Sequence, residues 1–464
     1  MRITTILSGL CLAISLSAFG SELPAPSAAP VFTTDVPGIS EEMLSADFWI
    51  QRIERDQTRM SPADIDRFNA ASFARGEYLN DLNQYPDRIS RARVLELLDG
   101  TSRLPNAPRF YADGRKVPQQ DFAALQASLQ RDAVPGEVEV RWGLVVKRAS
   151  MRGFPSDTPI YKNPQDLDLD RLQETGVFPG QQLALLHESA DGNWWFAVNY
   201  HYAAWVPKAA VAVGERAEIE SWLQRDRRLM VTGAQVETNY NPEDPRTSRQ
   251  LLDMGVSLPL LSARDVGHSV HGQNPYASYI VSLPVRGKGG GLEFEPTLIA
   301  RGRDVRVGPL PYRPSLVLRQ AFKFLGERYG WGHDYNARDC TGFVGDVYKT
   351  FGLLMPRNSG QQGQGKFAPT RFFEDGDREA RLQALEKLKV GDLIYIPGHV
   401  MMYIGSVDGE PYVIHDVTGL SYFKGDGSLY RGTLNGVSVT PLKPLRLSRE
   451  KSFIDGIYAI KTII

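Results

Sequence analysis

The sequence predicts an α+β, multidomain protein with a helical N-terminal segment, two small β-barrels and a C-terminal domain of mixed helices and strands. Three observations lead to this prediction. Apolar residues recur at helical spacing up to about residue 136, short alternating segments separated by turn residues follow to about residue 310, and a helix with a cysteine at its start opens the remainder. The 464 residues, 42% of them hydrophobic, can fill two to four domain cores of roughly 100 to 200 residues.

The first residues are typical of a secretory leader. Arg2 supplies a short positive start, Ile3 to Leu16 are mostly apolar, and Ala18-Phe19-Gly20 places small residues where a signal peptidase inspects the chain. We therefore expect a signal peptide over 1–20 that is cleaved before Ser21, with an uncleaved anchor as the alternative. No later stretch is apolar enough to span a bilayer, so stable membrane insertion is not expected after cleavage. The short positive start favours the periplasm, and secretion is the alternative.

Charge and cysteine content narrow the function further. The chain has 53 basic and 54 acidic residues, and a net charge of -1 argues against a nucleic-acid partner. Cleavage of the leader removes Cys11 and leaves Cys340 without a disulfide partner. A reactive thiol is therefore expected in place of a structural cysteine, and no cofactor is predicted.

A tether and a helical cap are predicted after the leader. Residues 21–40 are rich in Pro, Ala and Ser, as in a linker. Residues 41–136 are predicted to form the cap, in which Ser61-Pro62-Ala63-Asp64 combines an N-cap, a first-turn proline and an acidic third position. Apolar residues at helical spacing follow this start, and the segment carries no recognisable chemistry.

Two barrels are predicted next, over 137–214 and 215–310. In the first, a hairpin turn at 190–193 precedes the aromatic strands Trp194–Val198 and Tyr202–Val206, and this order resembles the end of a bacterial SH3-type domain. Its tryptophans can be barrel core or a surface that faces a ligand. The second stretch is also predicted to be SH3-like, interrupted by the glycine-rich run 287–291.

The C-terminal domain, 311–464, contains the predicted chemistry. From Cys340 apolar side chains recur at helical spacing until Gly352, so Asp339 falls at the N-cap and Cys340 at the first helical position. Unpaired N–H groups and the helix dipole favour negative charge there, which predicts a thiol shifted toward thiolate at neutral pH. An inert buried cysteine is the alternative.

Two histidines lie on strands predicted downstream. His399 begins one strand and His415 ends the next, and a three-residue loop at 407–409 would place His415 opposite Met401 on the face of His399. With Cys340 they would form a nucleophile, a base and an orienting residue. The same three side chains could bind a metal if His333 were the fourth ligand, although no metal is our expectation.

These motifs resemble one family. Asp339-Cys340-Thr341-Gly342-Phe343-Val344, the His399–Tyr403 segment, His415 and the upstream Tyr329-Gly330-Trp331-Gly332 run are similar to the NlpC/P60 cysteine peptidases, which have a papain-like fold and cut bacterial cell-wall stem peptides. The order of cap, barrels and peptidase domain resembles multidomain members that hydrolyse the γ-D-glutamyl-diamino acid bond. The family commonly has a second glycine where this chain has His333, to which no role is assigned.

The resemblance implies a role for each matching residue. Cys340 would be the nucleophile, His399 the general base and His415 the orienting residue. The implied substrate-binding residues are Asp339, Thr341, Tyr329, Trp331, Ser359 and, from the barrel, Tyr202. Asp339 would face the free amine of the stem's L-alanine, although a helix cap alone also explains it.

The predicted function is therefore hydrolysis of peptidoglycan stem peptides or muropeptides with a free N-terminal L-alanine, through a thiolate acyl-enzyme. Two rival functions stay open. One is a wall-binding SH3 scaffold with an inactive peptidase domain, and the other is an amidase or acyltransferase on the same fold.

Overall fold

The N-terminal helices pack on two different parts of the molecule. The computed structural model describes residues 32–463, so the predicted signal peptide and most of the 21–40 linker lie outside the described residues. The first elements are η1 (Glu41–Leu44), α1 (Ala46–Ile50) and α2 (Pro62–Arg75). In α2, Ser61 and Asp64 form the predicted capping box. The Asn69 side chain donates to the carbonyl of Gly352, and α1 packs against α7 (Pro314–Phe322), so this part lies on the C-terminal domain.

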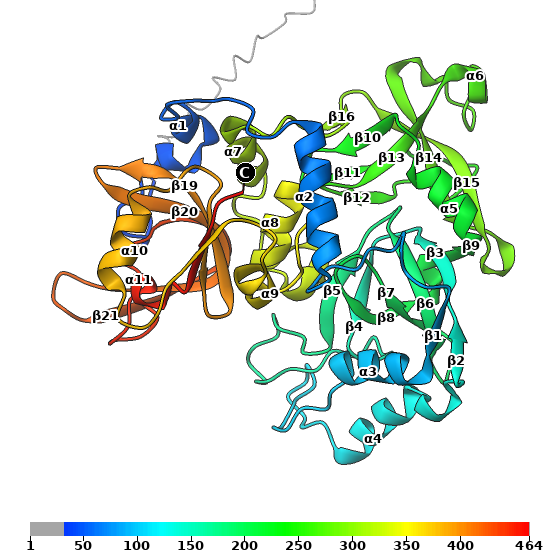
Figure 1. Ribbon diagram of the computed structural model, residues 1–464, viewed down its shortest axis with the longest axis horizontal. Helices are drawn as coiled ribbons and strands as arrows, with labels where there is room; N and C mark the ends of the chain where they lie inside the picture. The colour runs from blue at the N-terminus through cyan, green and yellow to red at the C-terminus, as the bar shows by residue number, and fades with distance from the viewer. Residues whose placement is uncertain (1–31, 464) are drawn as a thin grey trace, which may run out of the picture. The chain divides into compact units, whose positions relative to one another are not determined.

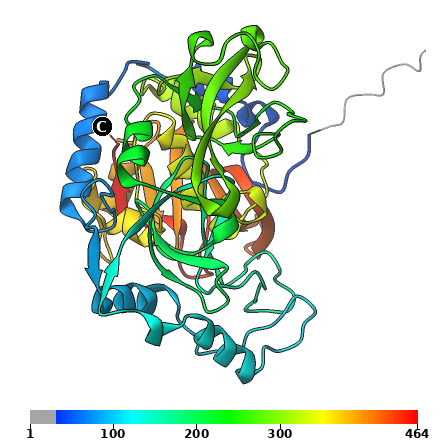
Figure 2. The same ribbon diagram turned by 90° about the vertical axis from the view of Figure 1, so that its right-hand side faces the viewer.

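The second part of the N-terminal segment packs on the first barrel. It consists of β1 (Arg88–Ser90), α3 (Arg91–Thr101), α4 (Gln119–Ser128) and η2 (Arg131–Ala133). The indole N–H of Trp205 donates to Ser102 Oγ (3.1 Å), and Thr101 Oγ1 donates to the carbonyl of Ala203 (2.7 Å). In Figures 1 and 2, α3 and α4 lie at the end of this barrel that is remote from the second barrel.

The first barrel is a seven-stranded antiparallel sheet in the order β5-β4-β8-β7-β6-β3-β9. Its strands are β3 (Arg141–Val145), β4 (Ala149–Arg152), β5 (Gln173–Val177), β6 (Gln182–Glu188), β7 (Trp194–Val198), β8 (Ala203–Pro207) and β9 (Val211–Gly214), with β2 (Glu137–Glu139) paired to β1 and η3 (Lys208–Ala210) before β9. Trp194, Trp195 and Trp205 are all at most 6% exposed, so the aromatic cluster forms barrel core.

The second barrel region follows α5 (Arg216–Leu223) and is built on a five-stranded sheet in the order β15-β14-β13-β10-β16. Its elements are β10 (Arg228–Val231), β11 (Gln235–Glu237), β12 (Leu251–Asp253), β13 (Ser257–Leu261), α6 (Ala263–Val266), η4 (Pro275–Ala277), β14 (Ser278–Arg286), η5 (Lys288–Gly290), β15 (Leu292–Ala300) and β16 (Val305–Val307). The glycine-rich run forms the turn between the two long strands β14 and β15. One apolar cluster continues from α3 through both barrels, so they share a core.

The C-terminal domain is a six-stranded sheet in the order β17-β22-β18-β19-β20-β21, covered by helices on both faces. Its elements after α7 are η6 (Trp331–Asn336), α8 (Cys340–Lys349), α9 (Ser359–Gln364), β17 (Thr370–Phe372), α10 (Arg378–Leu385), β18 (Leu393–Ile396), β19 (His399–Val407), β20 (Glu410–Phe423), β21 (Leu429–Pro441), α11 (Phe453–Gly456) and β22 (Ala459–Lys461). Helix α8 packs on one face (Figure 1), and α10 and α11 pack on the other. Within the described residues, no helix has the length and hydropathy to cross a membrane.

The hairpin that carries the two histidines differs from the predicted one in its turn. Two residues, Asp408 and Gly409, join β19 to β20, and both have positive φ (51° and 77°). Val407 pairs directly with Glu410. The predicted three-residue loop is therefore wrong, because this Asp-Gly pair forms the shorter turn that suits twisted strands.

A β-bulge in β19 nevertheless restores the predicted pairing. Between Tyr403 and Gly405 the register shifts by one residue, and Ile404 is the extra residue on that strand. Beyond the bulge the alignment sets His415 opposite Met401, as the sequence predicts. A two-residue turn alone would have moved His415 to the other face of the sheet, because side chains alternate along a strand.

Gly405 is the one residue that suits the bulge, since its φ is 148° and a Cβ there would lie 3.0 Å from the Trp49 ring. We expect Gly405→Ala to lower the free energy of unfolding by about 1 to 3 kcal/mol. Gly425→Ala is the matched control, because a Cβ at Gly425 meets no atom within 4 Å. Urea unfolding of both variants checks this, and equal stability of the two would contradict the role of Gly405.

Candidate active site

Cys340 lies at the first position of α8, as predicted. The N-cap residue is Asp339, whose Oδ1 accepts from the backbone N–H of Gly342 (2.8 Å). Cys340 is 7% exposed and makes no disulfide within the described residues. Helix α8 packs against β19, and Cys340 belongs to the same buried cluster as Val400, the residue after His399. The structure therefore brings the cysteine at the start of α8 to the start of β19.

The charge state of the thiol differs from the prediction. Burial, and then the negative charge of Asp339, raise the pKa of the Cys340 thiol to about 12. Hydrogen bonding from Val400 lowers the pKa but does not offset these effects. The expectation of a resting thiolate is therefore wrong, because the cost of burying the charge exceeds the stabilisation that the helix N-terminus provides.

The two histidines are directly hydrogen-bonded to each other. His399 Nε2 lies 2.8 Å from His415 Nδ1, and His415 Nε2 lies 3.0 Å from Thr440 Oγ1 on β21. Burial lowers the pKa of His399 to about 4 and the pKa of His415 well below its usual value, so both rings are neutral near pH 7. Thr440 did not emerge from the sequence, because only the pairing of β20 with β21 places it beside His415.

The hydrogen bonds that link His399, His415 and Thr440 allow one arrangement of protons in which His399 Nδ1 can accept a proton. His399 Nε2–H then donates to His415 Nδ1, and His415 Nε2–H donates to the Thr440 hydroxyl. A neutral thiol can react with a neutral imidazole as its base if proton transfer accompanies attack on the substrate.

An ion pair holds the N-cap in place. Arg357 donates to both oxygens of Asp339 (2.6 and 3.1 Å), and Thr341 Oγ1 and the N–H groups of Gly332 and Gly342 donate to the same carboxylate. Burial raises the pKa of Asp339, but these partners outweigh it. Arg357 has the largest effect among them, and the pKa of Asp339 stays below its ordinary value. Arg357 did not emerge from the sequence, since nothing local marks a residue 18 positions away as its partner.

Two more predicted residues, Tyr329 and Trp331, lie in the segment that leads to α8. Tyr329 is 7% exposed, and its phenol makes no hydrogen bond within the described residues. Burial and the nearby Asp339 raise the pKa of Tyr329, so the hydroxyl stays protonated and can donate. The indole N–H of Trp331 donates to the carbonyl of Gln173 (3.0 Å), which ties this segment to the first barrel.

The first barrel contributes a carboxylate that the sequence did not reveal. The Tyr202 hydroxyl donates to Glu174 Oε2. Burial raises the pKa of Glu174, while the hydrogen bond from Tyr202 and then the charge of Arg357 lower it. Tyr202 also lies near Asn358, the residue before Ser359 at the start of α9. The predicted residue Tyr202 therefore lies with Glu174 beside the Asp339–Arg357 pair. In the described chain, no three His, Cys, Asp or Glu side chains gather as a metal site.

Comparison with known families finds a match for two parts of the chain. Residues 326–437 match the NlpC/P60 family, and residues 159–207 match the SH3 domain of SH3b1 type. The C-terminal domain belongs to the NlpC/P60 family of cysteine peptidases. The predicted family and α+β multidomain architecture are thereby confirmed.

Two relatives match this chain over more than its C-terminal domain. A gamma-D-glutamyl-L-lysine dipeptidyl-peptidase from Bacillus cereus (strain ATCC 10987 / NRS 248) is 25% identical over 286 residues, which cover 54% of this chain and 75% of the relative. A solved NlpC/P60 endopeptidase from Photobacterium damselae subsp. piscicida has a TM-score of 0.70 at 16% identity, over 89% of this chain and 96% of that one. The latter shows that the whole fold is shared.

The raised pKa of Cys340 predicts how the thiol reacts with iodoacetamide. Because only the thiolate is alkylated, the rate constant should rise about tenfold per pH unit from pH 6 to 9. Mass spectrometry of the Cys340 peptide measures this rate, and Cys340→Ala accounts for labelling of Cys11. A rate that levels off below pH 8 would contradict a neutral resting thiol.

Proposed function

We propose that the protein is an exported cysteine endopeptidase that hydrolyses the γ-D-glutamyl-diamino acid bond of peptidoglycan stem peptides with a free N-terminal L-alanine. The observation that carries the proposal is the hydrogen-bonded His399–His415–Thr440 chain on the strands against which α8, with Cys340 at its start, packs. The likeness to a gamma-D-glutamyl-L-lysine dipeptidyl-peptidase supports the choice of bond. The predicted signal peptide supports export.

The reaction begins from the neutral pair. Cys340 Sγ attacks the γ-carbonyl carbon while the thiol proton moves to His399 Nδ1, and a thioester forms after the C–N bond breaks. The backbone N–H at the start of α8 and the free Tyr329 hydroxyl are the donors available to the oxyanion. His399 returns the proton to the leaving amine, and then activates the water that hydrolyses the thioester.

The substrate's free amine is best matched by Glu174. Asp339 already accepts five hydrogen bonds, so little of its acceptor capacity is left for a ligand. Glu174 Oε1, by contrast, accepts no hydrogen bond within the described residues, while Oε2 is held by Tyr202. An incoming ammonium group would pair with this carboxylate and lower the pKa that burial raises. The predicted contacts of Asp339, Thr341, Trp331 and Ser359 with substrate stay predictions.

The first test identifies the product. We expect the parent protein to release L-Ala-γ-D-Glu from L-Ala-γ-D-Glu-diaminopimelate, and Cys340→Ala to release none, because the nucleophile is lost. Liquid chromatography with mass spectrometry measures the release. Circular dichroism shows that the variant is folded. If the parent cleaves no stem peptide, or Cys340→Ala cleaves as well, the proposal is wrong. Transfer of the dipeptide to an added amine would favour an acyltransferase.

The second test asks whether Glu174 binds the free amine of the substrate. Glu174→Gln should lower kcat/KM for the free-amine tripeptide by about 10- to 100-fold, because it removes a charge-assisted hydrogen bond. For the N-acetylated tripeptide, Glu174→Gln should have the same kcat/KM as the parent. Glu137→Gln, at an exposed carboxylate on β2 outside the barrel sheet, is the control. An equal effect of Glu174→Gln on both peptides would contradict amine recognition by Glu174.

A further inference from the structure

His333 occupies an unusual position beside the cysteine helix. It lies in η6, is 3% exposed and has a φ of 66°, a left-handed conformation that a histidine seldom adopts. This is where the resemblance to the NlpC/P60 family leads one to expect glycine. A non-glycine residue with this backbone conformation lowers the stability of the fold. The contacts of the His333 side chain therefore need to be explained.

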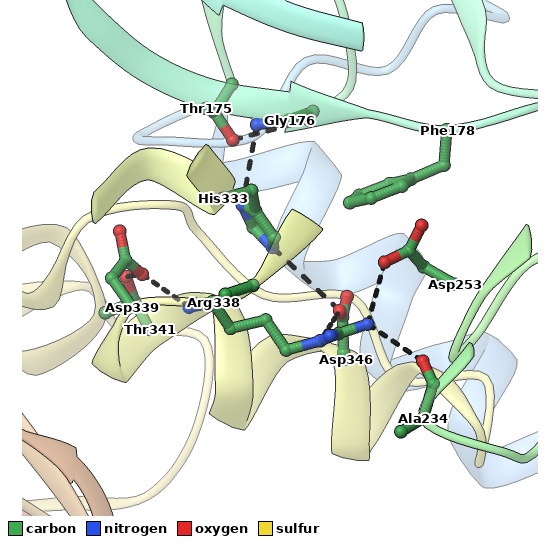
Figure 3. A network of polar contacts seen from close by, with 12 residues as sticks. Thr175, Gly176, Phe178, Ala234, Asp253, His333, Arg338, Asp339, Thr341 and Asp346 are labelled. Carbon is green, nitrogen blue, oxygen red and sulfur yellow. Dashed lines mark hydrogen bonds and ion pairs between the residues drawn. The ribbon is translucent and has the colours of Figure 1, made fainter. Parts of the chain in front are cut away.

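The imidazole is hydrogen-bonded on one side only. Its Nδ1 accepts from the backbone N–H of Gly176 on β5 (3.4 Å) and lies 3.4 Å from Arg357 Nη2 (Figure 3 shows the first contact). Since both neighbours are donors, the ring proton belongs on Nε2. Among the residues that the structure describes, Nε2 has no hydrogen-bond partner, and it lies 3.9 Å from Asp346 Oδ2.

The ring also fills the space between the barrel and α8. It packs edge-on against Phe178 with the ring centroids 5.3 Å apart. A Cβ on Gly176 would lie 2.8 Å from His333 Cβ, and a Cβ on Gly342 would lie 2.7 Å from His333 Nε2. Two glycines therefore allow this close contact, one on β5 and the other in the first turn of α8.

The charges around His333 keep it neutral. Burial, and then Arg357, Arg148, Arg338 and His201, lower its pKa well below the usual value. The carboxylate that faces the ring, on Asp346, is held by Arg338, which also pairs with Asp253 and Glu327 (Figure 3 shows the first two pairs). His333 thus lies between two buried ion-pair clusters, one around Arg338 and the other around Arg357.

We propose that His333 is a positioning residue that sets the spacing between the amine-binding carboxylate of Glu174 on β5 and the thiol of Cys340 on α8. Glu174 lies two residues from Gly176, and Cys340 lies two residues from Gly342, so the imidazole contacts the backbone beside both groups. This spacing selects substrates in which two residues separate the free amine from the scissile bond. The proposal rests on the proposed function.

Arg357 transmits the same constraint. Its Nε donates to Thr175 Oγ1 on β5 (2.7 Å), while its other nitrogens hold Asp339 at the N-cap of α8. His333 Nδ1 faces this guanidinium, so removal of the ring would take away one contact of Arg357, which Thr175 and Asp339 still hold. The imidazole and Arg357 therefore both join β5 to the start of α8.

The test compares two substitutions that suit a left-handed backbone, His333→Gly and His333→Asn. In the glycine variant, KM for the free-amine tripeptide should rise roughly tenfold with kcat nearly unchanged, because an acceptor and the packing against β5 are lost. The N-acetylated tripeptide should be cleaved as by the parent. Asparagine should recover most of the selectivity, since its carboxamide oxygen can accept from Gly176. His268→Asn, at an exposed histidine of the second barrel region, is the matched control.

Equal loss on both peptides, unchanged selectivity in His333→Gly, or no recovery in His333→Asn would overturn the proposal. A nitrogen-15 spectrum of the histidine-labelled full chain judges the geometry without activity or substitution. We expect His333 to carry its proton on Nε2 and not to titrate from pH 5 to 8. A proton on Nδ1 or a titration in this range would overturn the assignment. A parent that cleaves neither peptide would instead refute the proposed function, while the spectrum still reports on His333.

Discussion

The position of the thiol depends on the buried ion pair between Asp339 and Arg357. Asp339 caps α8 through its side chain, and Arg357 compensates the charge that this cap buries. A buried carboxylate without its partner would be costly, so the pair and the start of the helix form together. Because Arg357 also binds Thr175 on the barrel, the same pair joins the domain that carries Cys340 to the domain that walls its site.

Burial then decides how the site works. It keeps Cys340, His399 and His415 uncharged in the free protein, although a helix N-terminus alone would favour a thiolate. The hydrogen bonds to His415 and Thr440 orient His399 without a carboxylate, so its basicity is not raised by a neighbouring charge. The chemistry in this account therefore comes from proton transfer during attack, with substrate completing the charge balance of the site.

Much of the site could be predicted because its signals are local. The N-cap at Asp339 follows from a polar residue ahead of an apolar helical stripe, and the shared face of His399 and His415 follows from strand alternation. The route to that face was not predictable, since no local signal marks the bulge at Ile404, where the distant Trp49 lies close to Gly405. Arg357, Thr440 and Glu174 also escaped prediction, because tertiary contacts alone bring them to Asp339, His415 and Tyr202 respectively. The division of the N-terminal segment between two domains was missed for the same reason.

Capture of the intermediate tests the central claim most directly, namely that Cys340 attacks the γ-D-glutamyl carbonyl with His399 as its base. The full chain would be mixed with L-Ala-γ-D-Glu-diaminopimelate, quenched in acid within one turnover, and digested for mass spectrometry. The account predicts a thioester-linked L-Ala-γ-D-Glu on the peptide that contains Cys340, and a much slower build-up of this adduct in His399→Ala. Turnover with no adduct on Cys340, or equally rapid build-up without His399, would contradict it.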